Sequence, residues 1–161
     1  MSLTVRRAQL PDAPVIVEYN RLLALETEGK TLDLTVLTGG VTACLLDPRK
    51  GPYYLAEEDG LILGQMQITT EFSDWRNGWF WWIQSVYVRQ DARGRGIFRT
   101  LYEHVIKEAA QQPDVIGLRL YVDRENHAAQ KTYQKLGMVE TNYLFYERYP
   151  LEGGSREKIT D

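Results

Sequence analysis

Apolar residues at helical spacing predict two helices in the first third of the chain. The first helix follows Asp12, a capping residue, and ends at Gly29. The second follows Asp33 and stops at Asp47-Pro48, because the residue before a proline disfavours helical backbone. A short apolar strand over residues 3–7 precedes both helices. The chain therefore begins with one strand and two helices.

From residue 53 the apolar period changes to two, which indicates strands. Residues 53–57 and 61–70 predict a hairpin about a tight turn at Glu58-Asp59-Gly60. Residues 71–78 form a polar and aromatic loop. Residues 79–88 are nearly all apolar, which predicts a long central strand covered on both faces.

The second half of the chain alternates between the two periods. Ile97, Leu101, Val105 and Ala109 mark an amphipathic helix that Pro113 ends. The elements expected after it are a strand over 117–122, a helix from Asn126 to Gly137 and a last strand within 138–149. The order β-α-α-β-β-β-α-β-α-β predicts an α+β fold with a mixed, mostly antiparallel central sheet and helices on both faces.

Length and composition exclude several classes of protein. The 161 residues, 43% of them hydrophobic, suit one folded domain over residues 1–150, followed by a polar, flexible tail over 151–161. A net charge of −3 argues against a general nucleic-acid binder. The single cysteine, Cys44, excludes an internal disulfide and a Cys-rich zinc site, and we expect no metal. No signal peptide and no apolar run of about 18 residues is present, so we expect a cytoplasmic protein without a membrane partner.

A glycine- and arginine-rich loop carries the clearest chemistry. The strand Val86-Tyr87-Val88 leads into Arg93-Gly94-Arg95-Gly96, and a helix follows. Free N–H groups at a helix start, approached through glycines without Cβ atoms, favour an anion such as a phosphate. A dinucleotide site would need a third glycine where Arg99 stands, and no Gly-Lys-Ser/Thr of a P-loop is present. The loop therefore predicts a phosphorylated ligand of another kind.

This loop resembles the first signature of the Gcn5-related N-acetyltransferase (GNAT) family. The family pattern Gln/Arg-x-x-Gly-x-Gly/Ala, after a strand ending in Val-x-Val, corresponds here to Arg93-Gly94-Arg95-Gly96-Ile97-Phe98. Phe98 departs from the Gly/Ala of the pattern but still supplies a backbone N–H. A departure at this position can change how the helix packs.

A second stretch resembles the other family signature, Asn-x-x-Ala followed by Tyr and Leu-Gly-Phe. It is Asn126-His127-Ala128-Ala129, then Tyr133 and Leu136-Gly137-Met138. The two motifs occur in the family's order, and the resemblance covers about residues 3–149.

The resemblance implies that acetyl-CoA binds between the strand ending at Val88 and the strand ending at Val122. Its pyrophosphate would meet the N–H groups of the loop, its pantetheine arm would pair with the strand, and a donor near Val86 would hold the thioester oxygen. Tyr133 would protonate the leaving thiolate as an amine attacks directly. The residues implied in cofactor binding are Val86, Val88, Arg93, Gly94, Arg95, Gly96, Ile97, Phe98, Arg99 and Asn126.

The acceptor side is less well defined by sequence. No carboxylate lies in Trp82-Ile83-Gln84-Ser85, where many relatives carry the general base, so Glu26, Glu28 and a water chain are the alternatives. Trp75 and Arg76, in the polar and aromatic loop, are candidates for binding the acceptor amine, a small molecule or a protein amine. A non-catalytic acyl-CoA sensor is the alternative function. The length of the acyl group and a homodimeric state stay open.

Overall fold

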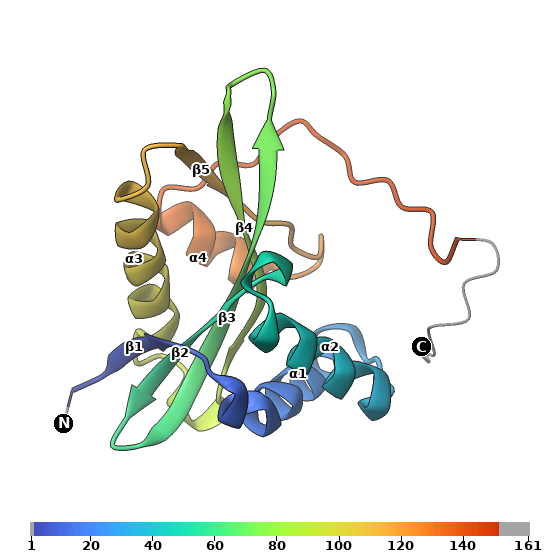
Figure 1. The fold of residues 1–161 in the computed structure, drawn as a ribbon, viewed down its shortest axis with the longest axis vertical. Coiled ribbons are helices and arrows are strands. Elements are labelled where there is room, and N and C mark those ends of the chain that lie inside the picture. The colour runs from blue at the N-terminus through green and yellow to red at the C-terminus, as the bar shows by residue number, and fades with distance from the viewer. Residues whose placement is uncertain (1, 152–161) are drawn as a thin grey trace. The chain divides into compact units, whose positions relative to one another are not determined.

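The computed structural model describes residues 2–151 and builds them around a central sheet (Figure 1). Its strands are β1 (Thr4–Arg7), β2 (Tyr53–Glu58), β3 (Leu61–Ser73), β4 (Gly78–Val88) and β5 (Val115–Arg119). They lie in the sheet in chain order, and all neighbours are antiparallel except the parallel pair β4–β5. The expected mixed, mostly antiparallel sheet is confirmed.

Helices cover both faces of this sheet. α1 (Ala13–Glu28) and α2 (Leu34–Leu46) lie on one face and α3 (Ile97–Ala110) on the other (Figure 1). Two neighbouring residues of β3 show the layers. A Cβ on Gly64 would lie 2.8 Å from Ile97 of α3, whereas the amide of Gln65 bonds to Asn20 of α1.

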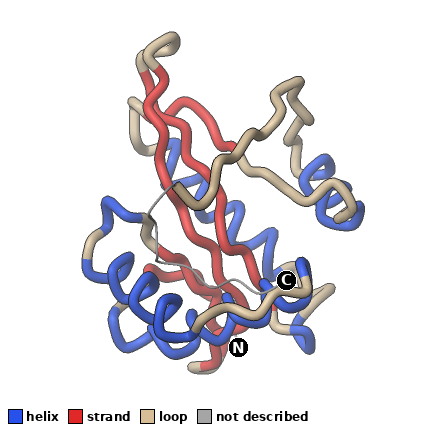
Figure 2. Tube along the Cα trace, turned by 90° about the vertical axis from the view of Figure 1, so that its right-hand side faces the viewer, coloured by secondary structure: helices blue, strands red, loops and turns tan. Residues whose placement is uncertain are grey.

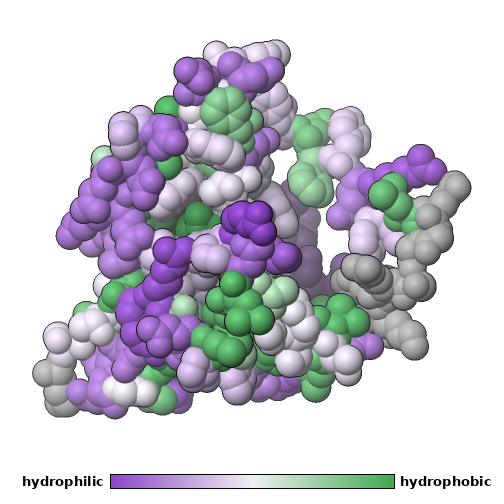
Figure 3. Space-filling model, viewed as in Figure 1, coloured by the Kyte–Doolittle hydropathy of each residue, from purple (hydrophilic) through white to green (hydrophobic). Residues whose placement is uncertain are grey.

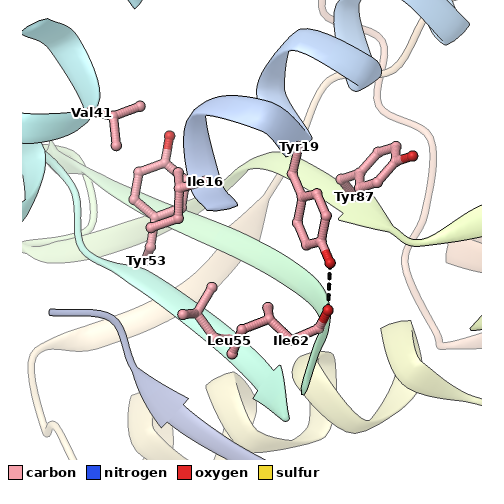
Figure 4. Packing of buried hydrophobic residues seen from close by; sticks show 7 residues of the cluster. All are labelled: Ile16, Tyr19, Val41, Tyr53, Leu55, Ile62 and Tyr87. Carbon is pink, nitrogen blue, oxygen red and sulfur yellow. Dashed lines mark hydrogen bonds between the residues drawn. The ribbon is translucent and has the colours of Figure 1, made fainter. Parts of the chain in front are cut away.

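The core under α1 is rich in tyrosine (Figure 4). Ile16 and Tyr19 of α1 pack among buried side chains of the sheet, and the rings of Tyr19 and Tyr87 lie 5.0 Å apart. The Tyr19 hydroxyl donates to the carbonyl of Ile62, and burial raises the pKa of this phenol. These contacts fix α1 against the end of β4 that carries Tyr87.

The helix boundaries follow the predicted caps, with one exception. The Asp33 carboxylate accepts from the N–H groups of Thr35 and Val36, and Gly29 ends α1 with a φ of 63°. Asp12 precedes α1 as expected, but its carboxylate does not cap the helix. It accepts instead from the Arg6 guanidinium at 2.9 Å, which lowers the pKa of Asp12. The boundary was therefore correct and its assumed cause was wrong.

The β3–β4 hairpin is longer than the sequence predicts. Ser73 pairs with Gly78, so residues 71–73 continue β3 and the turn shrinks to four residues. The far half of the hairpin extends beyond α1, α2 and α3 (Figures 1 and 2), and Phe72 and Trp79 are 49% and 37% exposed. The expectation that residues 79–88 are covered on both faces is wrong at the far end of the strand, where Trp79 is exposed.

Apolar side chains also gather on the surface over α2 (Figure 3). Leu34, Val36 and Leu46 are 51%, 50% and 66% exposed, and Val41 is the residue of this helix that is buried. Within residues 2–151, no helix is both long enough and apolar enough to cross a membrane.

A second compact unit begins at Tyr121 and contains α4 (His127–Lys135). The N–H groups of Gly137 and Met138 donate to the carbonyls of Gln134 and Tyr133, so Gly137 ends the helix as expected. The strand expected within 138–149 does not form in the described residues, and that prediction is wrong. A strand needs a hydrogen-bonded neighbour. Residues 138–149 form no hydrogen-bonded pairs with another strand, and most of their large apolar side chains are exposed.

The domain boundaries expected from sequence stay a prediction. Leu151 is exposed, and the rest of the expected tail, residues 152–161, lies outside the described residues.

Candidate functional site at the end of β4

β4 loses one neighbour before it ends. Its parallel pairing with β5 stops where Trp82 lies opposite Arg119, whereas the strand itself continues to Val88. Among residues 2–151, no other strand pairs with this edge of residues 83–88. A ligand with peptide-like amides can pair with such an open edge as an added strand.

A β-bulge lies in the same stretch. Gln65 pairs with Tyr87 and Gln67 pairs with Gln84, so Ser85 and Val86 together oppose one residue of β3. Ser85 has a φ of 48°, in the left-handed region that residues other than glycine rarely adopt. Such strain persists only where the surrounding structure holds the residue in place.

The loop after β4 presents unpaired backbone N–H groups. Gly94 and Gly96 have φ angles of 79° and 78°, which glycine adopts without strain. The N–H groups of Gly94, Arg95, Gly96, Ile97 and Arg99 donate to no group among residues 2–151. The first backbone bond at the start of α3 is from Thr100 N–H to the carbonyl of Gly96. This row of donors at a helix N-terminus favours an anion.

The arginines of the loop are held by carboxylates rather than left free. Arg95 contacts Glu58 at 2.8 Å and Arg99 contacts Glu103 at 2.8 Å. These side chains are partly exposed, so each ion pair contributes little to stability. Because the arginine side chains are paired in this way, the backbone N–H groups are the predicted contacts for a phosphate.

Arg93 joins the loop to the end of α1. Its guanidinium contacts the Glu26 carboxylate at 3.1 Å, and its Nε donates to the carbonyl of Val88 at 3.0 Å. It also lies 5.5 Å from the centre of the Tyr87 ring. Burial raises the pKa of Tyr87, and Glu26 raises it further. The structure thus brings Glu26 to the predicted cofactor loop, whereas Glu28 is exposed at the last turn of α1.

A buried polar cluster lies behind the bulge, and the sequence analysis missed it. Gln65 is fully buried, and its Nε2 donates to Asn20 Oδ1 at 2.9 Å and to the carbonyl of Ser85 at 3.0 Å. Asn20 is also buried, and its Nδ2 donates to the Tyr53 hydroxyl at 3.0 Å. The available signal was the pair Gln65 and Gln67 inside an otherwise apolar strand.

Trp75 and Arg76 lie at the other end of the hairpin. Trp75 is 85% exposed in the turn, and the Arg76 guanidinium lies 5.5 Å from the centre of the Phe80 ring. At about 3.3 Å per residue, the strand between Gly78 and Ser85 spans roughly 23 Å. The structure therefore does not bring Trp75 and Arg76 together with Glu26, and their role in acceptor binding stays a prediction.

Asn126 and Tyr133 belong to the second unit. Asn126 Oδ1 accepts from the N–H of Ala129 at 3.2 Å, so the residue caps α4 as its sequence position indicates. Tyr133 is half-buried on the same helix, and burial raises the pKa of its hydroxyl. The functional roles assigned to both residues stay predictions.

Comparison with known proteins gives a family and a fold. Residues 18–138 match the model of the acetyltransferase (GNAT) family. No curated protein matches the chain. A solved structure described as "a possible acetyltransferase", from Clostridium difficile 630, is 43% identical with a TM-score of 0.87, and the match covers 94% of this chain and 99% of that one.

Two more distant solved structures share the fold. A structure described as a "predicted acetyltransferase with acetyl-CoA", from Clostridium acetobutylicum, is 18% identical with a TM-score of 0.74, and the match covers 91% of this chain and 96% of that one. A ribosomal-protein-alanine N-acetyltransferase from Brucella melitensis biovar Abortus 2308 is 17% identical with a TM-score of 0.74, covering 92% and 100%.

Proposed function

We propose that this chain, which belongs to the acetyltransferase (GNAT) family, transfers the acetyl group of acetyl-CoA to an amine. The family and the structural neighbours support acyl transfer in general. The observation that carries the proposal is the row of unpaired N–H groups at Gly94, Arg95, Gly96, Ile97 and Arg99, next to the open edge of β4. The C. acetobutylicum neighbour, solved with acetyl-CoA, supports the choice of acyl donor.

The proposed cofactor contacts follow from these two features. The loop N–H groups, with that of Phe98, bind the pyrophosphate as hydrogen-bond donors in the positive field of the α3 N-terminus. The backbone of Val86 and Val88 pairs with the amides of the pantetheine arm. Asn126 is the proposed contact to the same arm from the second signature.

The proposed transfer is a direct attack of a neutral amine on the thioester carbon. The Val86 N–H donates to the thioester oxygen as negative charge develops on it, which is where a fixed donor lowers the barrier most. Tyr133 gives its hydroxyl proton to the departing thiolate. The proton lost by the amine goes to a base, for which Glu26 and Glu28 are the candidates beside a water chain.

The test is turnover with a panel of amines. Purified protein is incubated with acetyl-CoA and small or peptide amines, and free thiol and the acetylated product are measured together. Thiol release that matches acetylated amine is the expected result. Hydrolysis without acetylated amine, or absence of acetyl-CoA binding, would overturn the proposal.

Tyr133→Phe separates catalysis from binding. We expect kcat to fall about 10- to 100-fold, because general acid catalysis typically contributes at least that much, while affinity for CoA is kept. Tyr143→Phe, an exposed tyrosine of the same unit, is the control. The absence of a carboxylate at residues 82–85 favours one alternative, an acyl-CoA-binding sensor without chemistry. If the chain is such a sensor, the wild type binds acetyl-CoA tightly but forms no acetylated amine. Tyr133→Phe then has no turnover to lower.

A further inference from the structure

We propose that Gln65, held by Asn20, positions the backbone N–H of Val86 as the donor to the thioester oxygen of acetyl-CoA. This inference rests on the proposed function and identifies a positioning residue for it. Gln65 lies behind the bulge and contacts the backbone of β4, so its role is to position that backbone and not to touch the acetyl group.

Gln65 contacts the bulge directly. Its Nε2 donates to the carbonyl of Ser85 at 3.0 Å, across the sheet from β3 to β4. Ser85 is the residue with a φ of 48°. The side-chain amide of Gln65 therefore holds the carbonyl of the strained residue.

The planar peptide bond links the Ser85 carbonyl to the Val86 N–H. The Ser85 carbonyl and the Val86 N–H belong to one peptide group, and this bond is trans. In a trans peptide the C=O and N–H point in opposite directions. Because Gln65 holds the carbonyl from the side of α1, the Val86 N–H is aimed away from Gln65. Fixing one group thus fixes the direction of the other.

Asn20 holds the side-chain amide of Gln65. The second hydrogen of its Nε2 bonds to Asn20 Oδ1 at 2.9 Å, and Asn20 donates in turn to the Tyr53 hydroxyl. A flipped Gln65 amide would place its oxygen against two acceptors, Asn20 Oδ1 and the Ser85 carbonyl. Asn20 therefore selects the orientation in which Gln65 donates to the bulge.

The cluster is also costly for folding, which indicates a purpose other than stability. Gln65 is fully buried, and its Oε1 has no hydrogen-bond partner within the described residues. A buried acceptor without a partner is destabilising, and an apolar side chain of similar size would avoid this cost. We infer that the role of the cluster is to fix the Ser85–Val86 peptide group.

The test compares Gln65→Leu with Gln67→Leu. Gln67 faces the same layer from the same strand and is also buried, but its Nε2 donates to the carbonyl of Gly51 and to Cys44 Sγ, away from the bulge. Each variant is measured for kcat, for acetyl-CoA affinity by calorimetry, and for the infrared carbonyl band of bound ¹³C-acetyl-CoA without amine. A donor to the thioester oxygen moves this band to lower wavenumber.

We expect Gln65→Leu to lower kcat about 10- to 100-fold, somewhat less than deletion of an oxyanion donor, and to move the carbonyl band toward its position in free acetyl-CoA. Affinity should change less than about threefold, since the N–H row of the loop is untouched. Gln67→Leu should change neither kcat nor the band.

Gln65→Glu adds a pH signature that a merely structural role would not show. Burial raises the pKa of the introduced carboxyl, which donates to the Ser85 carbonyl only while it is protonated. The ratio of its kcat to that of the wild type should therefore fall as pH rises. The same ratio for Gln67→Glu should stay flat. If Gln65→Leu does not fold, Asn20→Leu serves in its place with the same readouts.

The outcomes separate the two claims. An active wild type with an unchanged band and kcat in Gln65→Leu would overturn the positioning role and leave the transferase intact. Equal losses of kcat in Gln65→Leu and Gln67→Leu would also overturn it, because they would report stability alone. A wild type that binds no acetyl-CoA would overturn the proposed function, and the inference with it.

Discussion

The two ends of the β3–β4 hairpin differ in how their polar groups are held. At the bulge, Gln65 and Asn20 are both buried, and their side-chain amides bond to each other. In the half nearer the turn, polar groups meet closer to the surface: Arg119 of β5 contacts Glu71 at 2.8 Å and lies 3.6 Å from the centre of the Phe80 ring.

This difference indicates which end of the hairpin carries the proposed transfer site. A surface ion pair has water as an alternative partner, so breaking it changes little. A buried amide has no alternative partner, so it can hold a strained backbone in one geometry. The end with buried partners is also the end with the open β4 edge and the unpaired N–H row. We therefore expect substitutions at the two ends to have unequal effects.

The largest expected difference is in stability. Ile68 and Phe72 lie on the same face of β3, but Ile68 is 2% exposed and Phe72 is 49% exposed. Ile68→Ala should lower the free energy of unfolding by about 2–5 kcal/mol, because it leaves a cavity in the core. Phe72→Ala should cost less than about 1 kcal/mol. Urea denaturation measures both, and similar losses would contradict the unequal cover of the hairpin.

The next effect is on cofactor affinity. Gly96→Val places a branched side chain at a φ of 78°, which costs about 1–2 kcal/mol, so the loop relaxes away from its binding geometry. Acetyl-CoA affinity measured by calorimetry should fall about tenfold. Gly60→Val introduces similar strain at a φ of 79° in the β2–β3 turn and should leave affinity unchanged. Equal affinities of the two variants for acetyl-CoA would show that the loop is not part of the acetyl-CoA site.

A smaller effect is expected in the titration of Asp91, just after β4. The Arg89 guanidinium bonds to this carboxylate and holds its pKa below the usual range. Because the folded-state pKa is lowered, the pair stabilises the fold above the unfolded pKa of about 3.9, and this contribution is lost as pH falls through the folded value. Arg89→Met should raise the pKa of Asp91 toward its ordinary value in an NMR titration. An unchanged titration would show that the pair does not form in solution.

The smallest effect is expected at the hairpin turn. Trp75 is 85% exposed, so Trp75→Ala should change the free energy of unfolding by no more than about 0.5 kcal/mol. A loss above about 2 kcal/mol would show that this side chain is packed. The KM of the same variant for an amine tests the predicted role of Trp75 in acceptor binding.

Sequence predicted best the features that depend on neighbours in the chain. The stop at Gly29, the cap at Asp33 and the helix end at Gly137 all follow from local backbone preferences. The glycine loop was identified for the same reason, because its φ angles and its N–H row come from adjacent residues. The family was identified from two such local motifs, and the family model confirms it.

Features that depend on distant residues were missed. The Arg93–Glu26 pair joins residues 67 positions apart, and the Gln65–Asn20 pair joins residues 45 apart. No periodicity encodes such pairs. The hairpin was too short in the prediction because polar residues 71–73 suggest a loop, whereas cross-strand pairing extends β3 to Ser73. The prediction of a last strand within 138–149 failed for a related reason, because a strand needs a hydrogen-bonded neighbour that the segment itself does not provide.

The most direct test of the account is an NMR titration of the ¹⁵N-labelled chain with acetyl-CoA. We expect saturable shifts of the amide signals of Gly94, Gly96 and Ile97, and of Val86 in the bulge, while the amides of Trp75 and Arg76 stay in place. Saturable binding that leaves the loop and bulge signals unchanged would contradict the assignment of the cofactor site to this end of β4.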